Sequence, residues 1–148
     1  MRRFLFSLVG LSLVFALAGC GTPPDRRLES PGLNVTALTR STDDYIVTLR
    51  YLNPNAVPLA VGSASHVLYL GEERIGKFDD KNSVGVPPLG VALHSVMLPR
   101  ALSKDVRDYL AGHAGEVQVV VQSSLEIVIS GDDLLSLKAS GSGKVTPK

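Results

Sequence analysis

The segment from Asp44 to Leu52, DYIVTLRYL, places an apolar residue at every second position. Successive side chains of a β-strand point to opposite faces, so one face of this segment is apolar while the other is mixed. The apolar face consists of Tyr45, Val47, Leu49 and Tyr51. This pattern predicts a strand that buries one face against a second layer of structure.

Segments of strand character recur along the chain at intervals of about 8 to 12 residues, with turn residues between them. They cover residues 66–70, 75–78, 84–86, 91–98, 117–129 and 134–145, and the fifth of these is long enough for one bent strand or two. About seven strands predict an antiparallel β-sandwich of immunoglobulin-like or fibronectin type III-like architecture. Gly76, inside the second segment, predicts a bulge or a close approach of backbone.

One segment has helical spacing. Ser103 is a good N-cap, Asp105 would lie in the first turn, and Val106 and Leu110 share a face four residues apart. Gly112 supplies a stop signal at the C-terminal end. We expect one short helix of about two turns, packed against an end or edge of the sheets because so short a helix is not stable alone.

The N-terminal residues resemble a processing signal. Two arginines precede an apolar run from Phe4 to Ala18, which is shorter than the roughly 20 residues that a membrane-spanning helix needs. The run ends in Leu17-Ala18-Gly19-Cys20, which resembles the lipobox of bacterial lipoproteins. The resemblance implies cleavage after Gly19 and lipidation of the Cys20 thiol. The alternative is a signal-anchor helix with an incidental cysteine.

These features divide the chain into three parts: a signal peptide at 1–19, a lipidated tether at 20–32 that is rich in Pro, Gly and charge, and a β-sandwich domain at 33–148. Palmitate and related acyl chains on Cys20 would anchor the protein, since each buried CH₂ contributes about 0.8 kcal/mol. Gly21 follows the cysteine. In lipoproteins this implies the outer membrane, on its periplasmic side, with the inner membrane and the cell surface as alternatives.

The net charge gives no sign of a polyanionic partner. Removal of residues 1–19 would leave 13 Lys and Arg against 14 Asp and Glu. A mature chain so close to neutrality, without a cluster of basic residues, argues against binding to nucleic acid. Contact with the membrane is therefore expected through the lipid anchor.

No pattern indicates a catalytic, metal or cofactor site. His66, His94 and His113 match no local metal-ligand spacing, and the first two fall in expected strands, where a solvent-facing or internally hydrogen-bonded histidine is expected. Pairs of aspartates at 43–44, 79–80 and 132–133 lie where strands begin or end, as Asp favours turns. The segment SGSGKV departs from a phosphate-binding loop, and GSASH lacks the spacing of a nucleophile elbow. We expect no enzyme activity and identify no small-molecule substrate.

The strand at 44–52 is interrupted by Asn53-Pro54-Asn55. Pro54 has no N–H and a fixed φ, so it cannot continue a central strand. Asn55 tolerates positive φ, and both amide side chains can bind backbone groups that the broken ladder leaves free. We therefore interpret the triplet as a structural corner and expect Asn53→Ala to cost about 1 to 2 kcal/mol of stability.

The stretch from Val47 to Phe78 resembles the water-stress and hypersensitive-response (WHy) domain of group 2 late-embryogenesis-abundant (LEA type 2) proteins. The resemblance rests on the order of short motifs: Asn53-Pro54-Asn55, Pro58-Leu59, Leu70-Gly71 and Ile75-Gly76, then VPPLG at 86–90 and Leu98-Pro99. It covers about residues 33 to 146. It implies a fibronectin-like β-sandwich with a helix, no enzyme activity, and a protective or binding role in desiccation and related stress.

The expected function is that of a non-enzymatic, membrane-anchored lipoprotein that binds or shields macromolecules during desiccation or envelope stress. The alternative is a periplasmic adaptor lipoprotein that binds one protein partner in the envelope, such as a transport or assembly complex.

Overall fold

The structure is a computed structural model that describes residues 27–130 and 132–147. The signal peptide at 1–19, Cys20 and the first part of the tether lie outside the described residues. The described residues form eight strands and one helix: β1 (Gly32–Ser41), β2 (Asp44–Leu52), β3 (Leu59–Leu70), β4 (Glu73–Asp80), β5 (Val84–Val86), β6 (Val91–Met97), α1 (Arg100–Ala111), β7 (Val117–Ser130) and β8 (Asp133–Val145).

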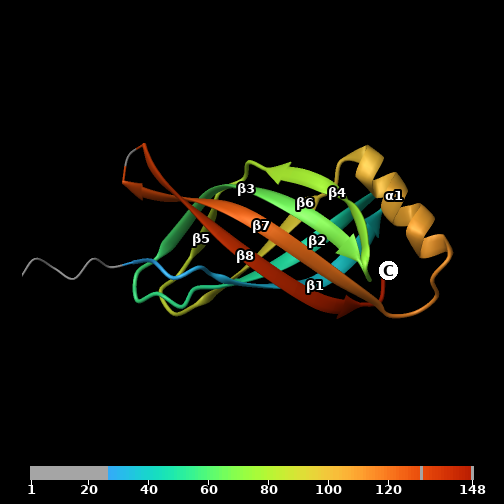
Figure 1. Cartoon of the computed structure of the whole chain (residues 1–148), viewed down its shortest axis with the longest axis horizontal. Coiled ribbons are helices and arrows are strands. Elements are labelled where there is room, and N and C mark those ends of the chain that lie inside the picture. The colour runs from blue at the N-terminus through green and yellow to red at the C-terminus, as the bar shows by residue number, and fades with distance from the viewer. Residues whose placement is uncertain (1–26, 131, 148) are drawn as a thin grey trace, which may run out of the picture.

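The strands form two antiparallel sheets that pack face to face (Figure 1). One sheet has the order β1-β2-β6, and the other has the order β4-β3-β7-β8 with β5 added beside β3. The predicted antiparallel β-sandwich is confirmed. The strand count is eight, against about seven expected, because β1 (Gly32–Ser41) was not among the segments recognised in the sequence.

The core lies between the sheets, and β2 shows how the sequence specifies it. Its burial alternates along the strand as the period of two predicts, with the apolar face fully buried and the mixed face partly exposed. The segment at 117–129 forms the single long strand β7, which pairs with β3 on one side and with β8 on the other. Its buried residues alternate in the same way: Val117, Val119, Val121, Leu125 and Ile127.

The two sheets close on one another where β1 crosses β8. A Cβ atom added to Gly141 or Gly143 would collide with the backbone of Leu33 or Val35, respectively. Glycine is therefore required at both positions so that the backbone of the smaller sheet can approach β8. The SGSG sequence has this packing role within a strand.

The bulge predicted at Gly76 is present. Leu68 pairs with Gly76 and Tyr69 with Arg74, so Ile75 is the extra residue of β4. A Cβ on Gly76 would collide with the side chain of Leu102. The close approach comes from a helix side chain, and not from backbone, because α1 packs over this edge of the larger sheet.

The helix begins earlier than the sequence signals predicted. It runs from Arg100 with Pro99 at the N-cap position, so Ser103 lies inside the helix and Asp105 lies beyond the first turn. Ser103 is buried: its Oγ accepts a hydrogen bond from the backbone N–H of Tyr45 at 3.1 Å and donates to the carbonyl of Leu98. Its role is to join the helix to β2. The predicted position of α1 against an edge of the sheets is correct.

The other end of α1 also differs from expectation. Gly112 is the C-cap residue, but it has φ −92° and ψ −4°, which is right-handed geometry. The left-handed conformation that usually selects glycine at this position is therefore absent here. His113 follows, and its Nδ1 lies 2.8 Å from the carbonyl of Tyr109, so this histidine binds the C-terminal end of the helix.

Candidate functional site

The most densely bonded polar group of the described chain is the corner at residues 53–58. Asn53 is 3% exposed. Its backbone N–H donates to the carbonyl of Gly90 at 2.9 Å, one position beyond the last pair of the β2–β6 ladder. Pro54 follows and has no N–H to donate, so the ladder ends here for the reason that the sequence predicts.

The side chain of Asn53 connects the two sheets. Its Nδ2 donates to the carbonyls of Val57 at 2.8 Å, Pro87 at 3.0 Å and Val86 at 3.3 Å. Its Oδ1 accepts from the backbone N–H of Asn55 at 2.9 Å. Val86 belongs to β5 of the larger sheet, and Asn53 follows β2 of the smaller one. The amide group of Asn53 therefore links the two sheets at this end of the sandwich.

Asn55 binds the segment through which the chain enters the domain. Its Nδ2 donates to the carbonyl of Glu29 at 2.9 Å, and its Oδ1 accepts from the N–H of the same residue at 2.8 Å. Its own carbonyl accepts from the N–H of Leu89 at 2.9 Å. The entry segment, the corner and the turn after β5 are thereby joined in one hydrogen-bonded unit.

The positive φ that Asn55 could have adopted occurs at Leu89 instead. Leu89 has φ +49°, and of the other described non-glycine residues Thr42 alone shares this property. Leu89 lies in a turn closed by the N–H of Gly90 on the carbonyl of Pro87 at 3.1 Å. A bulky side chain in the left-handed region is uncommon, and backbone strain of this kind clusters at functional sites.

A second polar cluster joins the end of β4 to β6 in the other sheet. His94 Nε2 donates to Asp80 Oδ2 at 2.5 Å, and the backbone and side chain of Asn82 donate to Asp80 Oδ1. Burial opposes ionisation of Asp80, but these hydrogen bonds outweigh it and hold the pKa of the carboxyl below its usual range. Asp80 thus accepts hydrogen bonds both from Asn82, two residues later in the chain, and from His94 in the other sheet.

His66 is fully buried beside this cluster and hydrogen-bonds to Ser123, with 2.7 Å between Nδ1 and Oγ. Burial lowers the pKa of His66 to about 4, and the nearby Asp80 carboxylate offsets part of this effect. The imidazole is therefore neutral at pH 7. Burial, and secondarily the Asp80 charge, raises the pKa of Tyr51, so its phenol is also neutral.

The Ser123–His66 pair does not have the geometry of a hydrolytic site. A catalytic base needs a third group on its other nitrogen, and the nucleophile must reach a substrate. Nε2 of His66 finds no hydrogen-bond partner among the described residues, and both side chains lie inside the sandwich. His66 and His94 are both internally hydrogen-bonded strand residues, which is one of the two arrangements expected from the sequence.

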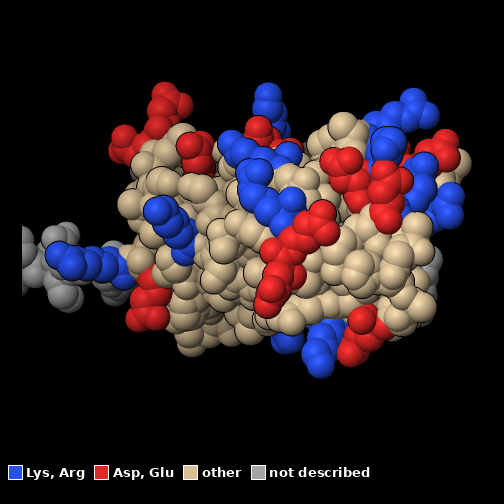
Figure 2. All heavy atoms as spheres, turned by 45° about the vertical axis from the view of Figure 1, so that its right-hand side comes forward, with Lys and Arg blue, Asp and Glu red and all other residues tan. Residues whose placement is uncertain are grey.

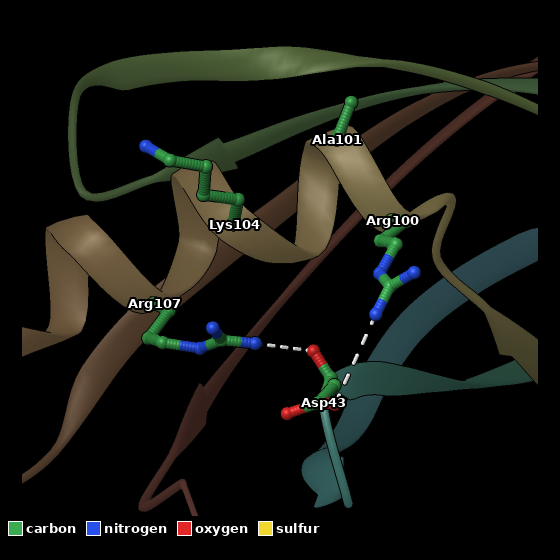
Figure 3. Close-up of a pocket in the computed structure, with 5 residues that line it drawn as sticks. All are labelled: Asp43, Arg100, Ala101, Lys104 and Arg107. Carbon is green, nitrogen blue, oxygen red and sulfur yellow. Dashed lines mark hydrogen bonds and ion pairs between the residues drawn. The ribbon is translucent and has the colours of Figure 1, made fainter.

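A pocket of about 510 Å³ lies where α1 meets the turn between β1 and β2 (Figure 3). It is lined by Asp43, Arg100, Ala101, Lys104 and Arg107. Arg107 donates to the carbonyl of Asp43, Arg100 lies 4.0 Å from its carboxylate, and Lys104 binds Asp108 at 2.6 Å. Each of these three cations therefore has a neighbouring oxygen as a partner.

No group of three or more metal-ligating side chains occurs in residues 27–130 and 132–147. Within the same ranges, α1 is the one helix, and it is too short and too polar to cross a membrane. The described structure does not include Cys20.

Comparison with known proteins identifies the fold. Neither a protein-family model nor a curated protein sequence matches the chain. The solution structure of AT1g01470 from Arabidopsis thaliana is similar, with a TM-score of 0.56 and 16% identity over 86% of this chain and 90% of that one. A late embryogenesis abundant (LEA) protein, At2g46140.1, has a TM-score of 0.51 and 16% identity over 78% and 70% of the two chains.

This chain has a LEA-like fold. At these identities the likeness concerns the fold alone, and it agrees with the architecture that the Asn-Pro-Asn motif and its neighbours implied.

Sequence reasoning singled out the Asn-Pro-Asn corner but missed its partners. Nothing in the sequence indicated that Asn55 would hold Glu29, 26 residues earlier, or that Leu89 would adopt the strained turn conformation. The pairing of Asp80 with His94 was also missed, because it depends on how two strands of different sheets pack against each other. The available signal was weak: Asp80 ends a strand rich in charged residues, and His94 lies within an apolar strand.

Proposed function

We propose that this protein is a lipoprotein, anchored to a membrane through Cys20, whose LEA-type β-sandwich protects or binds other macromolecules during desiccation or envelope stress. The observation that carries the proposal is the likeness of the fold to LEA proteins. The lipobox-like sequence before Cys20 supports the anchor. The favoured location is the outer membrane, facing the periplasm.

The proposed role requires no catalysis. The described Ser–His hydrogen bond lies inside the sandwich, and the cations of the pocket at α1 are bound to neighbouring residues. A protective or shielding function needs an accessible and stable surface instead. Exposed apolar side chains gathered at one place usually mark such contact surfaces.

The stress role is tested with a deletion strain of the source organism. We expect the deletion to reduce survival after drying and osmotic shock, and re-expression of the full chain to restore it. Re-expression of the Cys20→Ser variant should restore survival poorly, because the domain would no longer be held at the membrane. Equal survival of the deletion and parental strains would contradict the stress role.

A second candidate, the adaptor that binds one envelope protein, is favoured by the hairpin of β7 and β8. Its strands extend beyond the body of the sandwich (Figure 1), and four large apolar side chains near its end are exposed: Val128, Ile129, Leu134 and Leu135. A photo-cross-linking residue at position 134 should capture one stoichiometric protein if the adaptor hypothesis is right. Diffuse products, or none, would count against it.

A further inference from the structure

Three exposed apolar residues lie together where the chain turns from β5 into β6. Leu89 is 73% exposed, Val91 42% and Leu93 67%. Leu89 belongs to the turn, while Val91 and Leu93 begin β6 and point outward on the same face of the strand. We refer to these three residues as the apolar rim. Val91 lies opposite the partly exposed Leu52 of β2, which extends the apolar surface.

Few charged residues surround the rim, and Glu29 of the entry segment is one of them. No Asp, Glu, Lys or Arg occurs between Arg50 and Glu72 or between Lys81 and Arg100, so both loops at this end are uncharged. Figure 2 shows a dense group of acidic and basic side chains at the end that carries α1, and others at the opposite end. Arg50 lies opposite Leu93 and is exposed, which places one cation at the border of the apolar surface.

The conformation of Leu89 suggests that its exposed side chain has a use. The left-handed backbone at this residue would suit Gly or Asn better than Leu. A strained position that presents a bare leucine to solvent brings no packing benefit to the folded domain. Strain of this kind is retained where surrounding contacts enforce it and a function requires it.

The tether determines what this end of the molecule faces. Glu29 is bound by Asn55, and the carbonyl of Asn55 binds Leu89, so the chain enters the domain next to the rim. Figure 1 shows this entry at the end opposite α1. Cys20 precedes Glu29 by nine residues, which span at most about 30 Å when fully extended. An anchor on Cys20 therefore keeps the rim within about 30 Å of the bilayer.

We propose that the apolar rim rests on the lipid bilayer, with Leu89 in the interface between headgroups and acyl chains and Arg50 near the lipid phosphates. This inference rests on the proposed anchoring through Cys20. The contact would fix the orientation of the domain, with α1 and its charged residues directed away from the membrane. The β7–β8 hairpin suits lipid less well, because Asp132 lies in its turn, Asp133 begins β8, and carboxylates are costly to place in a bilayer.

The experiment uses residues 20–148, which include every described core residue from Leu28 to Val145. The Cys20 thiol, the single thiol of the chain, is coupled to a maleimide phospholipid in phosphatidylethanolamine–phosphatidylcholine vesicles with brominated acyl chains. The chain has no tryptophan, so Leu89→Trp and Leu93→Trp each introduce a unique fluorophore. Met97→Trp is the matched control, because Met97 is 59% exposed at the far end of the same strand.

We expect the emission of the L89W and L93W variants to shift to shorter wavelength and to be quenched by the brominated lipid, while the M97W variant stays unquenched. Equal quenching at all three positions, or none, would overturn the proposal. A shift of the L89W emission to shorter wavelength that occurs without vesicles, and that increases with protein concentration, would also overturn the proposal. The rim would then contact a second copy of the chain. Chemical coupling replaces cellular lipidation, so failure to label Cys20 in cells would refute the anchoring separately.

Discussion

Replacing Asn53 with alanine should cost the domain more stability than any other single change in the corner. The substitution removes the amide that holds the carbonyls of Val57, Val86 and Pro87 and the N–H of Asn55. The site is buried, so water cannot readily take over these bonds. The end of the sandwich where β2 and β5 meet would then keep only its backbone hydrogen bonds, from Asn53 to Gly90 and from Leu89 to Asn55.

The magnitude follows from a count of hydrogen bonds. The two protons of Nδ2 can satisfy two of the three carbonyls well, and Oδ1 accepts one backbone N–H. The further bond from the Asn55 side chain involves a half-exposed group that water can serve. Three bonds at about 1 kcal/mol each give a loss of about 3 kcal/mol, at the upper end of what one side-chain deletion usually costs. This exceeds the loss expected from the sequence alone.

The assay is urea unfolding of residues 20–148, with the free energy obtained by linear extrapolation. Asn55→Ala is the control, because its bonds to Glu29 are exposed and should contribute less than about 1 kcal/mol in total. A loss for Asn53→Ala no greater than that for Asn55→Ala would refute the conclusion that the buried amide holds the corner together.

Three further predictions concern stability. Gly143→Ala should destabilise the domain severely, since its Cβ would collide with the backbone of Val35, whereas Gly85→Ala, with open space around it, should change the unfolding free energy little. Burial lowers the pKa of His66 to about 4, so the unfolded chain binds a proton before the native one does as pH falls. Stability should therefore fall from about pH 6.5 toward pH 4, and His66→Gln should flatten that slope in denaturation series; an unchanged slope would contradict the assignment. Leu89→Asn should raise the unfolding free energy by roughly 0.5 to 1 kcal/mol by relieving the left-handed strain, and a decrease would mean that the leucine packs against the domain.

The fold was largely readable from the sequence because its strands alternate with a period of two. The buried row on β2 follows from local pattern, whereas the sequence left open whether the segment at 117–129 forms the one strand observed or two. The predicted start of α1 was wrong because the hydroxyl of Ser103 can form two different kinds of hydrogen bond. Its hydroxyl would suit an N-cap, but in the folded chain it satisfies the buried N–H of Tyr45, a partner 58 residues away.

The candidate site was only partly predictable from the sequence, because several of its contacts join residues that are far apart in the chain. The role of Asn53 follows from the missing N–H of Pro54, which is a local property. The pairing of Asn55 with Glu29, and the strain at Leu89, depend on three segments that meet only in the fold. Likewise, the close approach of β1 to Gly141 is a contact between sheets that no local pattern encodes.

The membrane anchor is the claim on which both the proposed function and the orientation of the domain depend. Cells that express the full chain should be grown with radioactive palmitate, and the protein should then be recovered from the membrane fraction. The account predicts that the natural chain carries the label and that Cys20→Ser carries none and leaves the membrane fraction. Equal labelling of the two chains, or an unlabelled natural chain, would contradict the account.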